Sequence, residues 1–254
     1  MLLAVCLTAT ATAGQSHQFR SSEYSGGSWE SANGSSASLR SVHQTTNGWA
    51  VAEKRGGKNG GVWFDCNAGG VPSPLGFDRS ATNLIAHVFA VVIADETSSL
   101  ATAISAPCAV RFVEDGDGSF FSASGSSEER ELSDSFRGMG NDVSVNARVG
   151  KMIVPGPKPQ LVECVFGEPV GMNRLYFGGA PASNRWGRNW RGAFVEILCF
   201  GEALDERRAN AVRRYLSVRN GMRLPTESDC ETTPILKALG LNHGGAFSTI
   251  LFVK

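Results

Sequence analysis

The sequence has no excess of charge of either sign. Its 24 Lys and Arg residues balance 24 Asp and Glu residues, and charged side chains make up only 19% of the 254 residues. A nucleic-acid interface needs clustered Lys and Arg to displace counterions, so this balance excludes nucleic acid as a partner. A long apolar run is also missing, because no stretch approaches the ~18 residues of a membrane-spanning helix. We therefore expect no transmembrane segment.

Metal and nucleophile motifs are missing as well. The six cysteines are widely spaced and include no Cys-x-x-Cys pair, which gives no support to a structural zinc site or a redox motif. The four histidines form no His-Glu-x-x-His pattern, and there is no Gly-x-Ser-x-Gly. Cys164 and Cys199 lie inside apolar runs, where free thiols pack as small hydrophobic side chains. His87 also lies in an apolar run, and we expect it to be a hydrogen-bonded core residue.

Residues 1–13 are typical of a secretory signal peptide. Residues 2–11 are apolar and almost uncharged, and Ala11-Thr12-Ala13 supplies an A-x-A cleavage pattern. We therefore expect the protein to be secreted, periplasmic or held at the cell surface. Lipidation at Cys6 is the alternative, because residues 3–6 resemble a lipoprotein box, although Val5 is bulkier than such a box requires.

Composition divides the rest of the chain into three parts. Residues 14–41 are rich in Ser and Gly, and such a segment buries too little apolar surface to order itself, which predicts a loosely held lead-in. Residues 42–224 alternate short apolar runs with Gly, Pro, Asn and Asp clusters, which predicts one folded domain. Residues 225–254 form a tail with a short helical pattern over 235–239, and no role is assigned to it.

The apolar runs of the central part predict strands. The strongest is LIAHVFAVVI at 84–93, which is apolar on both faces and so indicates a central strand covered on each side. Strands that recur with turn signals and without alternating helices argue against a parallel α/β sheet. The fold class expected is all-β, a two-sheet antiparallel sandwich. The other strand candidates are 110–113, 120–121, 143–149, 161–166, 175–177 and 193–200.

One amphipathic helix breaks this pattern near the end of the domain. Residues 203–221 place Ala209, Val212 and Leu216 on one face, with Asp205 as the N-cap and Gly221 where a helix would end. We expect its four central arginines mostly to face solvent: Arg207, Arg208, Arg213 and Arg214.

The last strand and this helix carry a family resemblance. RGAFVEILCF at 191–200, ALDERR at 203–208 and VRRYL at 212–216 together resemble the end of bacterial laminin-G-like, concanavalin A-like jelly rolls. LYFGG at 175–179 is similar to the family strand that ends in a Gly pair. The resemblance spans residues 40–224 and is most specific in the last forty of them. It implies a jelly-roll sandwich that serves as an extracellular carbohydrate- or protein-binding module.

Glu196 is a carboxylate in an otherwise apolar strand. Strand alternation places it on the face of Phe194, Leu198 and Phe200, and a buried carboxylate needs a partner. An arginine from the preceding loop is the natural candidate, with Arg191 the nearest. We therefore assign structural roles to Glu196, Arg191 and Asp205. The other candidate arginines of that loop are Arg185 and Arg188.

No catalytic residues are assigned. Glucanases of this architecture carry Glu-x-Asp-x-x-Glu on one strand, and that motif is absent. The acidic cluster at 128–134 lacks the spacing and reads as a solvated loop. We expect a non-catalytic binding or adhesion module. A glycan-cleaving enzyme on the same fold and a purely structural surface protein are the alternatives.

No cofactor or metal is assigned either. Calcium is the usual metal in this architecture, with oxygen ligands from loops. Asp115 with Asp117, or Asp65 with Asn67, would supply such oxygens, but a turn alone explains the Asp-Gly-Asp-Gly sequence. Calcium is therefore the alternative to an absence of cofactor.

The loop before the last strand is the candidate ligand site. Sugars are held by an aromatic platform together with amide and guanidinium donors. Trp186, Trp190, Asn184 and Arg188 supply those side chains within eight positions. The expected partner is a carbohydrate or another surface protein. The competing interpretation is that both indoles plug the sandwich edge while the arginines satisfy Glu196.

Overall fold

The structure is a computed structural model of the whole chain. It describes residues 16–42, 49–56, 60–64, 71–94, 113–114, 118–119, 122–125, 130–133, 142–149, 152–154, 156–178, 192–224 and 232–241. All statements below concern these residues.

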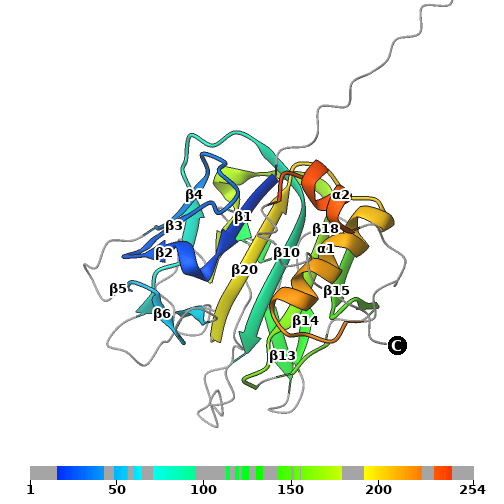
Figure 1. The fold of residues 1–254 in the computed structure, drawn as a ribbon. Helices are drawn as coiled ribbons and strands as arrows, with labels where there is room; N and C mark the ends of the chain where they lie inside the picture. The colour runs from blue at the N-terminus through cyan, green and yellow to red at the C-terminus, as the bar shows by residue number, and fades with distance from the viewer. Residues whose placement is uncertain are drawn as a thin grey trace, which may run out of the picture.

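An eight-stranded antiparallel sheet forms the centre of the molecule (Figure 1). Its strand order is β16-β15-β18-β10-β20-β7-β6, and β1 pairs with the remaining part of β20. The strands are β1 (Ser16–Arg20), β6 (Glu53–Arg55), β7 (Gly61–Phe64), β10 (Leu84–Ala94), β15 (Asp142–Val145), β16 (Arg148–Val149), β18 (Gln160–Gly171) and β20 (Gly192–Phe200).

A second antiparallel sheet of five strands packs on one face of the first. Its order is β19-β9-β4-β3-β2, from β2 (Tyr24–Ser25), β3 (Ser28–Glu30), β4 (Ser38–Ser41), β9 (Leu75–Phe77) and β19 (Tyr176–Phe177). Two 3₁₀ turns, η1 (Ser21–Glu23) and η3 (Met172–Arg174), connect strands. The shorter strands are β5 (Trp49–Ala50), β8 (Val71–Pro72), β11 (Val113–Glu114), β12 (Gly118–Ser119), β13 (Ser122–Gly125), β14 (Arg130–Ser133) and β17 (Met152–Ile153), of which β5 and β8 pair in parallel.

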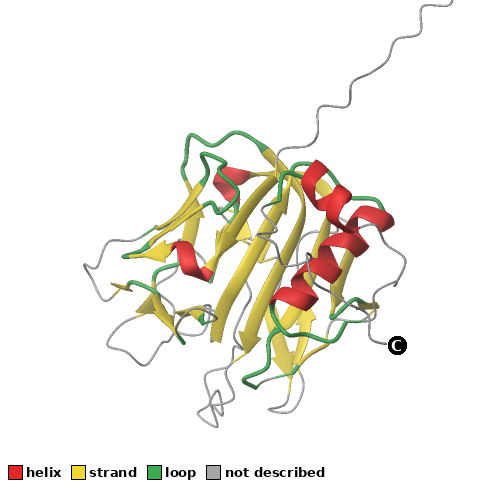
Figure 2. Cartoon of the chain, in the orientation of Figure 1, coloured by secondary structure: helices red, strands yellow, loops and turns green. Residues whose placement is uncertain are grey.

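Two apolar clusters lie on opposite faces of the eight-stranded sheet. The inner cluster fills the space between the sheets, where Phe19, Trp29 and Phe177 are fully buried. The outer cluster lies between the sheet and two helices, α1 (Glu206–Arg219) and α2 (Thr232–Ala238). Figure 2 shows both helices over this outer face. The central strands are therefore covered on each side, which explains why all residues of β10 except His87 are apolar.

The architecture confirms the expected all-β, two-sheet antiparallel sandwich followed by an amphipathic helix. β10 matches the strand predicted at 84–93 and lies between β18 and β20. In α1, Ala209, Val212 and Leu216 are buried, and the carboxylate of Asp205 accepts the N–H of Arg208 at 2.8 Å as an N-cap.

The expected lead-in over 14–41 is wrong for the residues that the structure describes. β1 pairs with β20 along its whole length, and β2, β3 and β4 belong to the second sheet. Each of these short strands sends one large apolar side chain into the inner cluster, among them Phe19, Trp29 and Leu39. Average composition hid this pattern, because the many serines outnumber the few large apolar residues that enter the core.

Part of the tail also belongs to the domain. α2 packs on α1, and the side chains of Leu236, Leu239 and Leu241 are buried in the outer cluster. The short helical pattern expected over 235–239 therefore marks a real helix that extends the apolar cover of the sheet.

Candidate functional site

A β-bulge in β20 sets the position of Glu196. Val92 pairs with Phe194 and Val91 pairs with Glu196, so Val195 is the extra residue. Phe194 therefore points into the inner cluster, while Val195 lies in the outer cluster. The expectation that Phe194 shares a face with Glu196 is wrong, because the bulge interrupts the alternation between them. Glu196 shares the outer face with Leu198 and Phe200.

Glu196 is buried, with 2% of its surface exposed, and both its oxygens accept hydrogen bonds. Gln18 Nε2 donates to Oε1 at 2.7 Å and the Tyr215 hydroxyl donates to the same oxygen at 3.2 Å. Arg219 Nε donates to Oε2 at 3.1 Å and Asn220 Nδ2 does so at 3.3 Å.

The arginines that the structure pairs with Glu196 come from distant elements. Arg219 lies in the last turn of α1, and Arg20 lies opposite Glu196 on β1 with its Nε 3.6 Å from Oε1. The predicted burial is therefore confirmed, but these two arginines are not the ones expected from the preceding loop. The predicted Arg191 lies outside the described residues.

Tyr215 connects the same cluster to the helix. Its hydroxyl oxygen accepts from Gln18 Nε2 at 2.7 Å and from Arg20 Nη2 at 2.9 Å. Burial and the neighbouring charge of Glu196 raise the pKa of Tyr215 above its ordinary value. The phenol therefore stays protonated and donates to the carboxylate.

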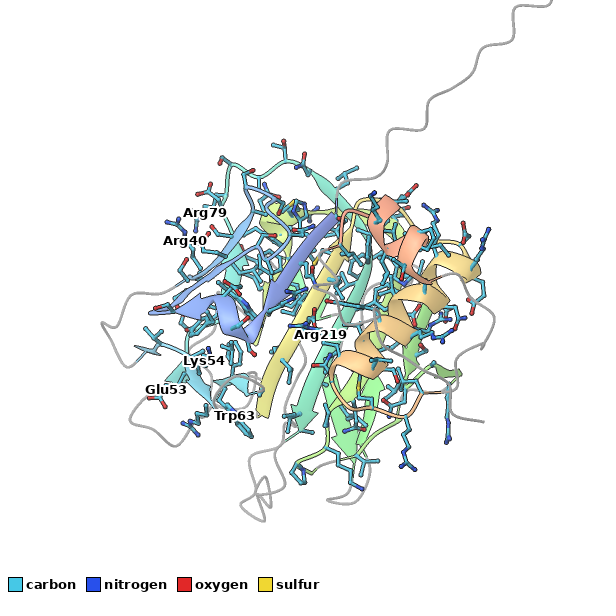
Figure 3. All side chains as sticks on the ribbon, in the orientation of Figure 1. Arg40, Glu53, Lys54, Trp63, Arg79 and Arg219 are labelled. Atoms are coloured by element: carbon cyan, nitrogen blue, oxygen red, sulfur yellow. The ribbon has the colours of Figure 1, made fainter. Side chains whose placement is uncertain are left out.

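A hollow of about 580 Å³ opens above Glu196 on the outer face of the sheet. Arg219 lies there between α1 and β20 (Figure 3). The floor is Ile93, Val195 and Glu196, and the walls come from η1, the C-terminal end of α1 and a proline-rich turn. The wall residues are Arg20, Ser21, Ser22, Pro157, Pro159, Val218, Arg219, Asn220 and Gly221.

Trp63 lies on the same face beside this hollow. Ile93 pairs with Ala193, and Ala193 pairs with Trp63, so all three point outward from the sheet. Strand spacing places Trp63 roughly 10 Å from Ile93. The indole is half-buried, and the guanidinium of Arg55 lies 5.9 Å from the ring centroid.

A second buried carboxylate, Glu163, lies on β18 beneath the first half of α1. Arg213 holds it through Nε at 2.7 Å and Nη2 at 2.8 Å, and His87 Nε2 lies 3.1 Å from Oε1. Burial alone would raise the pKa of Glu163, but the hydrogen bonds from His87 and Arg213 and the charge of Arg213 outweigh it and lower the pKa. The expectation that Arg213 faces solvent is therefore wrong, because its side chain is directed to the buried Glu163 and is only 14% exposed.

His87 is a buried, hydrogen-bonded residue, as predicted. Its Nδ1 accepts the backbone N–H of Leu204 at 3.2 Å, which requires the tautomer that carries hydrogen on Nε2. Nε2 is then the donor to Glu163. Since both ring nitrogens are engaged, His87 fixes the start of α1 over the sheet.

The predicted ligand loop lies outside the described residues. That applies to Asn184, Trp186, Arg188 and Trp190, and also to the calcium candidates Asp65, Asn67, Asp115 and Asp117. In the described part of the chain, no three His, Cys, Asp or Glu side chains gather as a metal site. No described helix has the length and apolar character needed to cross a bilayer.

The sequence analysis missed Arg20 and Arg219, which line the hollow, and Trp63, which lies beside it. The alternation of Gln18, Phe19 and Arg20 was a usable signal, because it places Phe19 on the opposite face from the other two.

Comparisons with protein families, curated proteins and solved structures found no match for this chain.

Proposed function

We propose that the protein is an exported, non-catalytic binding module of the laminin-G-like type, and that its ligand is a carbohydrate held on the outer face of the eight-stranded sheet. The observation that carries the proposal is the hollow above Glu196. It combines guanidinium and amide groups from Arg219 and Asn220 with the apolar surfaces of Ile93 and Val218. Its volume of about 580 Å³ lies within the range of small-molecule sites.

The position of Trp63 favours a saccharide as the ligand. Sugar rings present an apolar C–H face to an aromatic platform and hydroxyls to polar donors. The indole is half-buried, and its residue lies two strands from Ile93, roughly 10 Å away along the sheet, which leaves room for a neighbouring ring of the same chain. The loop with Trp186 and Trp190 leads directly into Gly192, the first residue of β20, so it is the second candidate platform.

Two observations favour binding over glycoside cleavage. Glu163 and Glu196 are each held by an arginine, and register across β10 places their Cα atoms roughly 12 Å apart. Glycosidases need two carboxyl groups in one site, with one of them free to transfer a proton. Here Arg213 and Arg219, six positions apart on α1, draw the two carboxylates to separate sites.

A glycan array of the purified protein, followed by calorimetry on the best ligand, tests the proposal. We expect a saccharide to bind, and Trp63→Ala to weaken it at least tenfold with the melting temperature nearly unchanged. Trp186→Ala and Trp190→Ala in the same assay identify whether that loop contributes. Absence of binding to every saccharide would contradict the proposal and favour a structural surface protein, whereas release of shortened glycans would favour an enzyme.

A further inference from the structure

We infer that the hollow selects acidic sugars, with the carboxylate of a uronate bound by the terminal nitrogens of Arg219. This inference rests on the proposed function and adds the chemical class of the ligand.

The charges that line the hollow leave a net positive site. Among the described residues that line it, Arg20 and Arg219 are the cations and Glu196 is the anion. Glu196 is saturated, because Oε1 accepts from Gln18 and Tyr215 while Oε2 accepts from Arg219 and Asn220. The carboxylate therefore positions its neighbours, and the charge left for a ligand to balance is positive.

Arg219 is oriented for this role. Its Nε is fixed by Glu196 at 3.1 Å, while the side chain remains 32% exposed at the wall of the hollow. Within the described residues, its terminal nitrogens have no hydrogen-bond partner. A guanidinium presents two parallel N–H groups that match the oxygens of a carboxylate. Because Glu196 already orders the side chain, binding loses less conformational freedom than it would with a free arginine.

The end of α1 does not cancel this charge. The last carbonyls of a helix carry partial negative charge, which disfavours a nearby anion. Here the Leu216 and Ser217 carbonyls accept the N–H groups of Asn220 at 3.0 Å and of Met222 at 2.9 Å. Arg219 is itself in the last turn, so the positive charge lies where it also stabilises the helix.

The apolar walls distinguish a sugar acid from a free inorganic anion. The side chains of Ile93, Pro157, Pro159 and Val218 line part of the hollow and offer no donor or acceptor that would solvate a small ion. They match the C–H face of a pyranose ring whose carboxylate points to Arg219. Val218 is 44% exposed, so it forms the mouth of the site.

The test uses oligomers of galacturonate, glucuronate and mannuronate, each paired with its uncharged methyl ester, in calorimetry at low salt. We expect at least one acid to bind at least tenfold more tightly than its ester. Arg219→Lys keeps the positive charge but loses the two parallel N–H groups of the guanidinium. We expect this variant to lose most of the preference for the acid over the ester. The exposed Arg223 lies outside the hollow, so Arg223→Gln is the matched control that leaves both affinities unchanged.

A second pair of variants avoids the contact with Glu196. Val218→Gln and Val218→Glu both remove the apolar side chain at the mouth, and they differ only in charge. Relative to Val218→Gln, we expect Val218→Glu to weaken the acid a further fivefold or more and to leave the ester unchanged. Melting temperatures confirm that each variant folds.

Equal binding of acid and ester would overturn the inference and leave the proposed function standing. Equal binding of a sulfated oligosaccharide and a uronate would overturn the assignment of a carboxylate. Failure of all the oligomers and of the glycan array would overturn the proposed function and the inference together.

Discussion

Two buried carboxylates fasten α1 to the sheet, Glu196 near its last turn and Glu163 beneath its first half. Burial of an isolated carboxylate is costly, and a salt bridge repays that cost only when the remaining lone pairs are also satisfied. Glu196 meets this condition with four hydrogen-bond donors from β1, α1 and the C-cap residue Asn220. Glu163 meets it with Arg213 and His87.

Replacing Glu196 by Ala tests this arrangement. We expect the free energy of unfolding to fall by about 3 kcal/mol or more, because Arg20 and Arg219 lose a buried acceptor. The exposed Glu53, whose side chain is 61% accessible in its pair with Arg55, provides the control. Glu53→Ala should change the same quantity by no more than about 0.5 kcal/mol. Urea denaturation measures both, and equal effects would show that the buried network is not stabilising.

The lowered pKa of Glu163 predicts how the stability of the protein depends on pH. Its pKa is lower in the folded protein than its ordinary value of 4.5, so the unfolded chain binds the proton more tightly. The stabilisation is therefore fully present above that ordinary value and is lost as pH falls through the lower, folded pKa. We expect Glu163→Gln to flatten the decline in unfolding free energy below pH 4.5. Denaturation series from pH 7 to pH 3 measure the unfolding free energy of the wild type and of Glu163→Gln. If this free energy falls equally in both proteins, Glu163 is not the source of the pH dependence.

At the scale of elements, α2 is a short helix whose contribution is apolar. Leu236 is fully buried in the outer cluster, whereas the adjacent Lys237 is exposed. Truncation of a buried leucine leaves a cavity, so we expect Leu236→Ala to cost about 2–5 kcal/mol. Lys237→Ala should have an effect within about 0.5 kcal/mol. A negligible effect of both substitutions on thermal unfolding would mean that α2 adds nothing to the outer cluster.

The elements that sequence patterns predicted are those with strong local signals. β10 has a long apolar run, and α1 has an N-cap at Asp205 and a buried face at 3.6-residue spacing. The bulge at Val195 has no local signal, because two pairing strands determine it. β1 to β4 were missed because each contributes few apolar residues, and their burial depends on partners far along the chain.

The candidate site was predictable only in part for the same reason. Glu196 is conspicuous in an apolar strand, so its burial and its need for a cation follow from the sequence. The identity of the cation does not, because Arg20 is 176 positions away and reaches Glu196 only through the pairing of β1 with β20. Trp63 likewise comes to lie beside the hollow only through strand register.

At the scale of the whole molecule, the start and the end of the described chain stabilise each other. β1 pairs with five residues of β20, and the Ser16 hydroxyl donates to the Leu239 carbonyl at 2.5 Å. Removal of residues 1–20 deletes this strand together with Phe19 and Arg20, and we expect cooperative thermal unfolding to be lost. Removal of residues 1–13, which leaves β1 intact, should preserve it. A cooperative transition in both truncated proteins would show that β1 is dispensable.

The pairing of β1 with β20 also affects how the protein is made. Gln18 contacts Glu196 across 178 positions, so a ribosome that adds about 5–20 residues per second needs roughly 10–35 s between them. Throughout that interval Phe19 has no β20 to pack beside, and the growing sheet keeps an unpaired edge that invites association with other chains. Co-translational folding of the central sheet can therefore finish only after nearly the entire domain has emerged.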